Sequence, residues 1–134
     1  MRTVLIADDD PDILALVTFK VRQAGYTLIT ATDGAAALAA ARETPPDLAV
    51  LDVSMPRMSG LEVCRELRAD PATKQVPVLL LTARAQEADI EAGFDVGAND
   101  YVVKPFSPRD LLARIIAILG PADGSDPPPA TLDV

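Results

Sequence analysis

Acidic side chains stand at two points of this sequence where a short aliphatic run ends. Asp8, Asp9 and Asp10 directly follow the first such run, and Asp52 follows the third. Two carboxylates about 4 Å apart repel by roughly 4 kcal/mol at an effective dielectric of about 20, so acids that meet in one cleft need a compensating cation. Carboxylate and carbonyl oxygens suit Mg²⁺, and Mn²⁺ accepts the same donors. If both points share one edge of a sheet, the sequence predicts a divalent-metal site there.

The segments that must position these acids alternate between short aliphatic runs and longer stretches of helical periodicity, from residue 3 to residue 119. Several runs are continuously apolar, which is typical of parallel strands covered by helices on both faces. A barrel would need about twice as much chain. We therefore predict an α/β fold, a doubly wound (βα)5 open parallel five-stranded sheet with right-handed crossovers. The expected strands are Thr3–Ala7, Thr27–Ala31, Leu48–Leu51, Val76–Leu81 and Asp100–Val103.

Capping residues predict where several of the helices begin. A side-chain oxygen at such a position satisfies backbone N–H groups of the first turn. The second helix, roughly Asp33 to Glu43, is rich in alanine, and the fourth, near Gln86 to Val96, lacks a strong cap and contains Gly93. We expect the fourth helix to be the least stable and a candidate for movement. The first, third and fifth helices are expected to start after Asp10, Ser59 and Ser107.

Polar residues end four of the five expected strands. The fourth strand ends at Thr82 and the fifth at Lys104, in addition to the acids that follow the first and third. In a parallel sheet of this kind ligands bind outside the carboxyl ends of the strands. Each residue alone has a plain structural explanation, since Asp8 and Asp9 fit solvated loop acids and Asp10 fits a helix cap. Their coincidence at four strand ends favours a functional site.

The composition limits the classes of function. The 134 residues fit one domain over 1–119, followed by a Pro- and Asp-rich flexible tail or linker over 120–134. One cysteine and no histidine exclude an internal disulfide, a His/Cys zinc site and His-based acid–base catalysis. The net charge of −8 opposes direct binding of nucleic acid and of anionic membranes. The apolar stretches are far shorter than the roughly 20 residues that span a bilayer, so we expect a cytoplasmic protein.

Four segments resemble, in order and spacing, the receiver domain of bacterial two-component response regulators of the chemotaxis-regulator type. The resemblance runs from about residue 2 to residue 119 and implies a flavodoxin-like strand order of 2-1-3-4-5. It also implies that a sensor histidine kinase or phosphotransfer protein phosphorylates the domain, which then switches conformation to control an output. The segments are Val4-Leu5-Ile6-Ala7-Asp8-Asp9-Asp10, Leu51-Asp52-Val53-Ser54-Met55-Pro56 with Gly60, Leu81-Thr82-Ala83 and Val103-Lys104-Pro105-Phe106.

The resemblance assigns the residues that would carry out phosphorylation. Asp52 would be the phosphoacceptor and a ligand of the Mg²⁺ or Mn²⁺ ion. Asp9 and the backbone carbonyl of Ser54 would also bind the ion directly, and Asp8 would act through water. Lys104 would pair with a phosphoryl oxygen, and the peptide bond that follows it resembles a cis peptide of the family.

The resemblance also assigns a switch and an output surface. The Thr82 hydroxyl would reach the phosphoryl group, and the Tyr101 ring would turn inward with it. Alone, Tyr101 fits an ordinary half-buried strand aromatic, but its position three residues before Lys104 favours the switch. A downstream target would bind the face formed by the fourth helix, fifth strand and fifth helix, and homodimerisation is one expected consequence of activation.

Two other classes of protein fit parts of the pattern. A Mg²⁺-dependent aspartyl-nucleophile phosphatase also uses Asp and Lys at strand ends, but such enzymes usually place a second acid where this chain has Ser54. A flavodoxin-like binder of small molecules fits the fold, but the acidic cleft would repel a flavin phosphate and no anion-binding loop follows the first strand. We therefore expect a switch that assists its own phosphorylation and dephosphorylation, and not a turnover enzyme.

Overall fold

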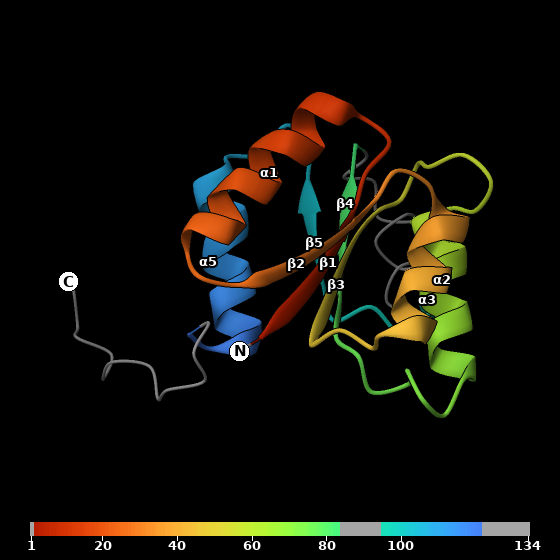
Figure 1. Ribbon diagram of the computed structural model, residues 1–134. Coiled ribbons are helices and arrows are strands. Elements are labelled where there is room, and N and C mark those ends of the chain that lie inside the picture. The colour runs from red at the N-terminus through yellow and green to blue at the C-terminus, as the bar shows by residue number, and fades with distance from the viewer. Residues whose placement is uncertain (1, 84–94, 122–134) are drawn as a thin grey trace.

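The computed structural model describes residues 2–83 and 95–121, which form an α/β fold around one sheet (Figure 1). All strand pairs are parallel, and the strand order is β2-β1-β3-β4-β5. Both features confirm the prediction from the sequence. The strands are β1 (Thr3–Ala7), β2 (Thr27–Ala31), β3 (Leu48–Asp52), β4 (Val78–Thr82) and β5 (Asp100–Val103).

Three boundaries, on two strands, differ from the expected ones. β4 begins at Val78 and not at Val76, because Pro77 lies between them and has no N–H to donate to a ladder. β3 and β4 both continue through a polar residue, Asp52 and Thr82. The end of an apolar run therefore does not mark the end of the strand.

The helices cover the sheet in two layers (Figure 1). α1 (Pro11–Gln23) and α5 (Pro108–Leu119) lie on one face, and α2 (Gly34–Glu43) and α3 (Gly60–Ala69) lie on the other. In the described ranges, no helix has the length and apolar character needed to cross a membrane. The fourth predicted helix lies almost entirely outside the described residues, as does most of the tail at 120–134.

The predicted helix starts are confirmed by side-chain caps. Asp10 Oδ1 accepts the backbone N–H of Asp12 at 2.9 Å and that of Ile13 at 3.3 Å. Ser59 Oγ accepts the N–H of Glu62 at 3.2 Å, and Ser107 caps α5 in the same manner. Asp10 therefore has the structural role that its position before a proline predicted.

Two hydrophobic clusters, one on each face, hold the layers together. Successive strand residues alternate between them: Leu5 and Leu51 belong to the cluster under α2 and α3, and Val4 and Val50 to the cluster under α1 and α5. Burying each such side chain contributes about 1.5–3 kcal/mol relative to exposure. Cys64 is fully buried in the first cluster, and burial raises the pKa of its thiol. It is a packing residue.

Candidate metal centre

Three carboxylates converge at the carboxyl ends of β1 and β3. One oxygen from each of Asp8, Asp9 and Asp52 lies within 4.8 Å of the other two. Parallel pairing explains this, because Ala7 is in register with Leu51 and the residues that follow them emerge side by side. Asp8 is fully buried and Asp52 is 3% exposed, whereas Asp9 faces solvent. The cluster is thus a buried acidic pair with an open side at Asp9.

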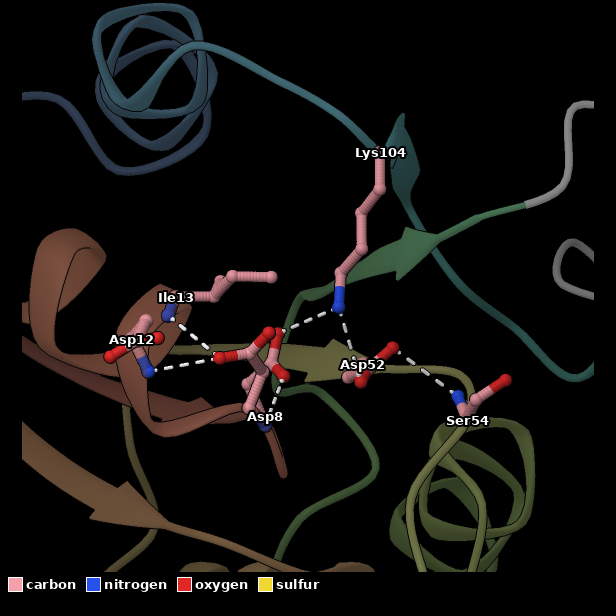
Figure 2. A network of polar contacts seen from close by, with 7 residues as sticks. Asp8, Asp12, Ile13, Asp52, Ser54 and Lys104 are labelled. Atoms are coloured by element: carbon pink, nitrogen blue, oxygen red, sulfur yellow. Dashed lines mark hydrogen bonds and ion pairs between the residues drawn. The ribbon is translucent and has the colours of Figure 1, made fainter.

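Lys104 brings one ammonium group to these acids. Its Nζ lies 2.9 Å from Asp8 Oδ2 and 3.2 Å from Asp52 Oδ2, and Figure 2 shows the side chain pointing from beyond the end of β5 toward both. The backbone N–H of Lys104 donates to the Thr82 carbonyl at 2.7 Å, which extends the pairing of β5 with β4 by one residue. The peptide bond to Pro105 is cis, as the resemblance implied.

The charges of this cluster do not balance. Burial raises the pKa of Asp52 to about 6, and the negative charge of Asp8 adds to the effect; Lys104 and the Ser54 N–H act in the opposite direction. Burial tends to lower the pKa of Lys104, but the hydrogen bond to Asp8 and the charges of Asp8 and Asp52 outweigh it, so that pKa is raised. One ammonium therefore faces three carboxylates. This donor set fits a hard divalent cation, which takes oxygen ligands.

The backbone around Asp52 is held by its neighbours. The Ser54 N–H donates to Asp52 Oδ1 at 3.3 Å, and the Val53 N–H donates to the Leu81 carbonyl at 2.8 Å. The Gly60 N–H donates to the Val53 carbonyl at 3.1 Å. A Cβ on Gly60 would overlap the Asp52 carbonyl, so glycine lets α3 start directly against the strand that carries this acid. The sequence predicted that the third helix starts after Ser59, but it did not predict this close approach of Gly60 to Asp52.

The two predicted switch residues lie on neighbouring strands and on the same face of the sheet. Tyr101 is in register with Leu80, and both side chains pack against the cluster under α2 and α3. Thr82 lies two residues beyond Leu80 and therefore points to the same face. Thr82 is 8% exposed and Tyr101 is half-buried. The structure thus brings Asp8, Asp9, Asp52 and Lys104 into one cluster, with Ser54, Thr82 and Tyr101 on the adjoining segments.

The family described as the response regulator receiver domain matches residues 4–116. The chain belongs to that family. As a receiver domain it is the phosphorylated module of a two-component response regulator, which decides against the phosphatase and flavin-binding alternatives. A receiver is a signalling switch.

Named relatives include full-length transcriptional regulators. The receiver is 44% identical over 118 residues to the alkaline phosphatase synthesis transcriptional regulatory protein PhoP of Bacillus subtilis, a match that covers 88% of this chain and 48% of PhoP. The chain spans about half the length of the curated relatives it matches.

Solved receiver structures share the fold over nearly their whole length. The chemotaxis protein CheY4 of Vibrio cholerae is 37% identical with a TM-score of 0.84, covering 89% of this chain and 99% of CheY4. The receiver domain of a sensor histidine kinase from Pseudomonas aeruginosa PAO1 is 29% identical with a TM-score of 0.81, covering 89% of this chain and 98% of that one. That structure has a magnesium ion coordinated in its active site cleft.

Proposed function

We propose that this receiver accepts a phosphoryl group on Asp52 in a reaction that depends on Mg²⁺ or Mn²⁺. Asp9, Asp52 and the backbone carbonyl of Ser54 would bind the ion directly, and Asp8 would act through water. One observation carries the proposal: three carboxylates lie within 4.8 Å of one another, and a single lysine contacts two of them. A cluster of this composition needs a divalent cation to bring a phosphoryl group close to it.

The chemistry that the chain supplies is nucleophilic attack by a positioned carboxylate. An Asp52 oxygen attacks the phosphorus of a phosphohistidine, the N–P bond breaks, its electron pair stays on the leaving imidazole, and an acyl phosphate forms. A pKa of about 6 leaves Asp52 mostly ionised at neutral pH, so its oxygen is available to attack. When bound, the ion neutralises charge on the transferring phosphoryl group. The ammonium of Lys104 is placed to pair with a phosphoryl oxygen.

The consequence of phosphorylation would be a change of conformation. We infer that the Thr82 hydroxyl moves toward the phosphoryl group and that Tyr101 turns inward, because both lie on one face of adjacent strands. The affected output face would include β5 and α5; the fourth helix, which the resemblance also assigns to this face, lies almost entirely outside the described residues. Moving a two-state equilibrium from 1:99 to 99:1 takes about 5.5 kcal/mol of differential interaction. A downstream target or a second copy of the receiver would recognise this face.

The phosphodonor would be a sensor histidine kinase or a phosphotransfer protein. Leu16 and Phe19 on α1 are 55% and 64% exposed, and Leu16 lines an apolar pocket of about 110 Å³ together with Lys104 and Phe106. An apolar surface next to the phosphoacceptor is suited to a protein donor. We assign the receiver to the cytoplasm. We propose that it acts as a switch and not as a turnover enzyme, and that it makes no direct contacts with nucleic acid or membrane.

The test is phosphorylation by acetyl phosphate with and without Mg²⁺, followed by intact mass measurement. We expect a phosphoryl adduct that requires Mg²⁺, is removed by hydroxylamine and is absent from Asp52→Asn. Asp10→Asn is the matched control, because Asn caps a helix as well as Asp does and Asp10 caps α1. An adduct that forms without the metal, or that persists in Asp52→Asn, would refute the proposal.

A further inference from the structure

β5 carries Tyr101 and leads to Lys104, yet it is an edge strand of four residues with β4 as its partner. Its position therefore depends strongly on what holds its two ends. At the carboxyl end Lys104 bonds to Thr82 and to the acids. At the amino end the chain that enters β5 is attached to α3, through a residue outside the site described above.

That residue is Arg68, near the end of α3. Its guanidinium donates to the Gly97 carbonyl from Nε at 3.1 Å and from Nη2 at 2.8 Å. Nη2 also donates to Asn99 Oδ1 at 3.1 Å, and Nη1 donates to the Val76 carbonyl at 2.7 Å and the Lys74 carbonyl at 3.2 Å. One planar side chain thus joins α3, the segment before β4 and the segment before β5.

The residues around this guanidinium are arranged to accommodate it. Gly97 has φ +96, where any other residue would be strained, and a Cβ there would lie 2.9 Å from Arg68 Nε, so a side chain would also displace the guanidinium. Asn99 Oδ1 accepts the Val78 N–H at 2.9 Å, and the Asn99 N–H donates to the Val78 carbonyl at 2.8 Å. The Cys64 thiol donates to the Val96 carbonyl at 3.4 Å. Residues 96–99 are therefore fixed to α3 and to the start of β4 together.

This attachment has a direct path to the phosphoacceptor. From Asn99 the chain runs through the β5 pairs with β4, from Asp100 opposite Leu79 to Val103 opposite Thr82, and then reaches Lys104. A functional group must be held within roughly 0.5 Å of its productive position, whereas one residue of a strand spans about 3.3 Å. A small slide of β5 at its start would thus misplace the Lys104 ammonium.

We propose that Arg68 is a positioning residue for phosphorylation: by fixing residues 96–99 it sets the placement of β5 and thereby aims Lys104 at Asp8 and Asp52. The proposal rests on the phosphoacceptor function proposed above. Arg114 holds β5 from the opposite face, with Nη1 at 3.0 and 2.8 Å from the two Asp100 carboxylate oxygens. That ion pair is exposed, at 49% and 30%, so solvent and salt weaken it. Arg114 Nη1 also donates to the Tyr101 carbonyl, but at 3.4 Å and in an exposed position. Arg68 makes shorter, part-buried hydrogen bonds to the carbonyls of Val76 and Gly97, at 2.7 and 2.8 Å, and is the firmer attachment.

The experiment compares Arg68→Met in two backgrounds, wild type and Lys104→Met. The rate of Mg²⁺-dependent adduct formation from acetyl phosphate is measured by intact mass, at a temperature where circular dichroism shows each variant folded. In the wild-type background we expect about a tenfold loss of rate, since misplacement by 1 Å can cost about a hundredfold. In the Lys104→Met background we expect less than about a twofold further loss of rate. The effects of two substitutions do not add when one residue acts through the other.

Two controls separate positioning from charge and from folding. Arg65→Met removes the same charge from an exposed position of the same helix and should leave the rate unchanged. Arg68→Lys keeps the charge but not the planar fork, and should show the same pattern with a smaller loss if Arg68→Met does not fold. Hydrogen exchange gives an independent readout: Arg68→Met should accelerate exchange at residues 100–103 and leave residues 48–51 unchanged.

Three results would overturn the proposal. They are an unchanged rate in folded Arg68→Met, an equal loss in both backgrounds, and equal acceleration of exchange in β5 and β3. If Lys104→Met forms too little adduct to measure, the exchange comparison decides alone. Failure of the proposed function is distinguishable, because wild-type protein itself would then form no Mg²⁺-dependent adduct on Asp52.

Discussion

The two ends of the sheet use charged side chains in opposite ways. At the carboxyl ends, Asp8, Asp9 and Asp52 face one ammonium, and burial and mutual repulsion raise the pKa of Asp52 to about 6. At the amino ends, the Arg68 guanidinium is surrounded by carbonyl and amide oxygens of two segments, the one before β4 and the one before β5. The first arrangement is unfavourable until a cation and a phosphoryl group arrive. The second is satisfied within the chain.

The two ends of the sheet therefore have different roles. The carboxyl ends are suited to binding an ion, and the amino ends hold the strands in position. Unbalanced buried charge lowers the free energy of unfolding of the resting domain, but it creates affinity for a divalent ion. Satisfied hydrogen bonds at the opposite end stabilise the strands whose other ends carry the acids. Removing the charge of Arg68 should therefore lower the free energy of unfolding, and removing the charge of Asp52 should raise it.

The largest expected effect is at the amino end. Arg68→Met should lower the free energy of unfolding by about 2–3 kcal/mol, because the carbonyls of Gly97 and Val76 are part-buried and lose their donor. Urea denaturation at neutral pH measures this. Arg65→Met, at an exposed position of the same helix, should change it by less than about 0.5 kcal/mol. If both substitutions changed the free energy of unfolding equally, the hydrogen bonds of Arg68 would not be what stabilises the amino ends of the strands.

At the carboxyl ends of the strands, removing a charge is expected to raise the free energy of unfolding. In metal-free buffer near neutral pH, Asp52→Asn should raise the free energy of unfolding by about 1–2 kcal/mol, because it removes a buried charge next to Asp8. Thermal and urea denaturation both report the change. Saturating Mg²⁺ should stabilise wild type and narrow the difference. A destabilised Asp52→Asn would show that the acid is compensated within the chain.

The pH dependence of that difference tests its cause. Asp52 titrates near 3.8 when exposed and at about 6 in the fold, so between these values the native state binds more protons than the unfolded chain. Stability contributed by this group is thus greatest below about pH 4 and is lost as pH rises through about 6. The gain from Asp52→Asn should accordingly be small near pH 4 and level off above pH 7. A gain independent of pH would exclude this titration as its source.

The smallest effect concerns backbone strain in the loop after Asp52. Arg57 has φ 70, a left-handed conformation that favours glycine. Its ion pair with Asp33 is 3.8 Å long and its side chain is 74% exposed, so the pair contributes little. Arg57→Gly should raise the free energy of unfolding by up to about 1 kcal/mol. Arg57→Ala should give no such gain, because alanine keeps the Cβ; a gain with alanine would contradict the explanation.

The sheet and the acidic cluster could be predicted because both follow from short-range patterns. Continuous aliphatic runs identified the parallel strands, and parallel register then required Asp8 and Asp52 to emerge at the same edge. The caps at Asp10, Ser59 and Ser107 were predictable because each side chain acts within its own first turn.

The attachment made by Arg68 could not be predicted in this way. Its acceptors are mostly backbone carbonyls, which every residue carries, and they come from segments up to 31 residues away. A helical arginine near a C-terminus fits an ordinary solvated position equally well. Gly60 was similarly ambiguous, because a glycine at a helix start does not reveal which backbone it approaches. Both depend on packing between elements, and the sequence pattern within one element carries no signal for it.

The most direct test of the central claim, that the acids form one divalent-ion pocket, is to locate Mn²⁺ by anomalous scattering in crystals of the receiver. We expect one strong anomalous peak between the carboxylates of Asp9 and Asp52, beside Asp8 and the Ser54 carbonyl, and its loss in Asp52→Asn. A receiver that binds Mn²⁺ at another place, with these carboxylates directed apart, would contradict the claim.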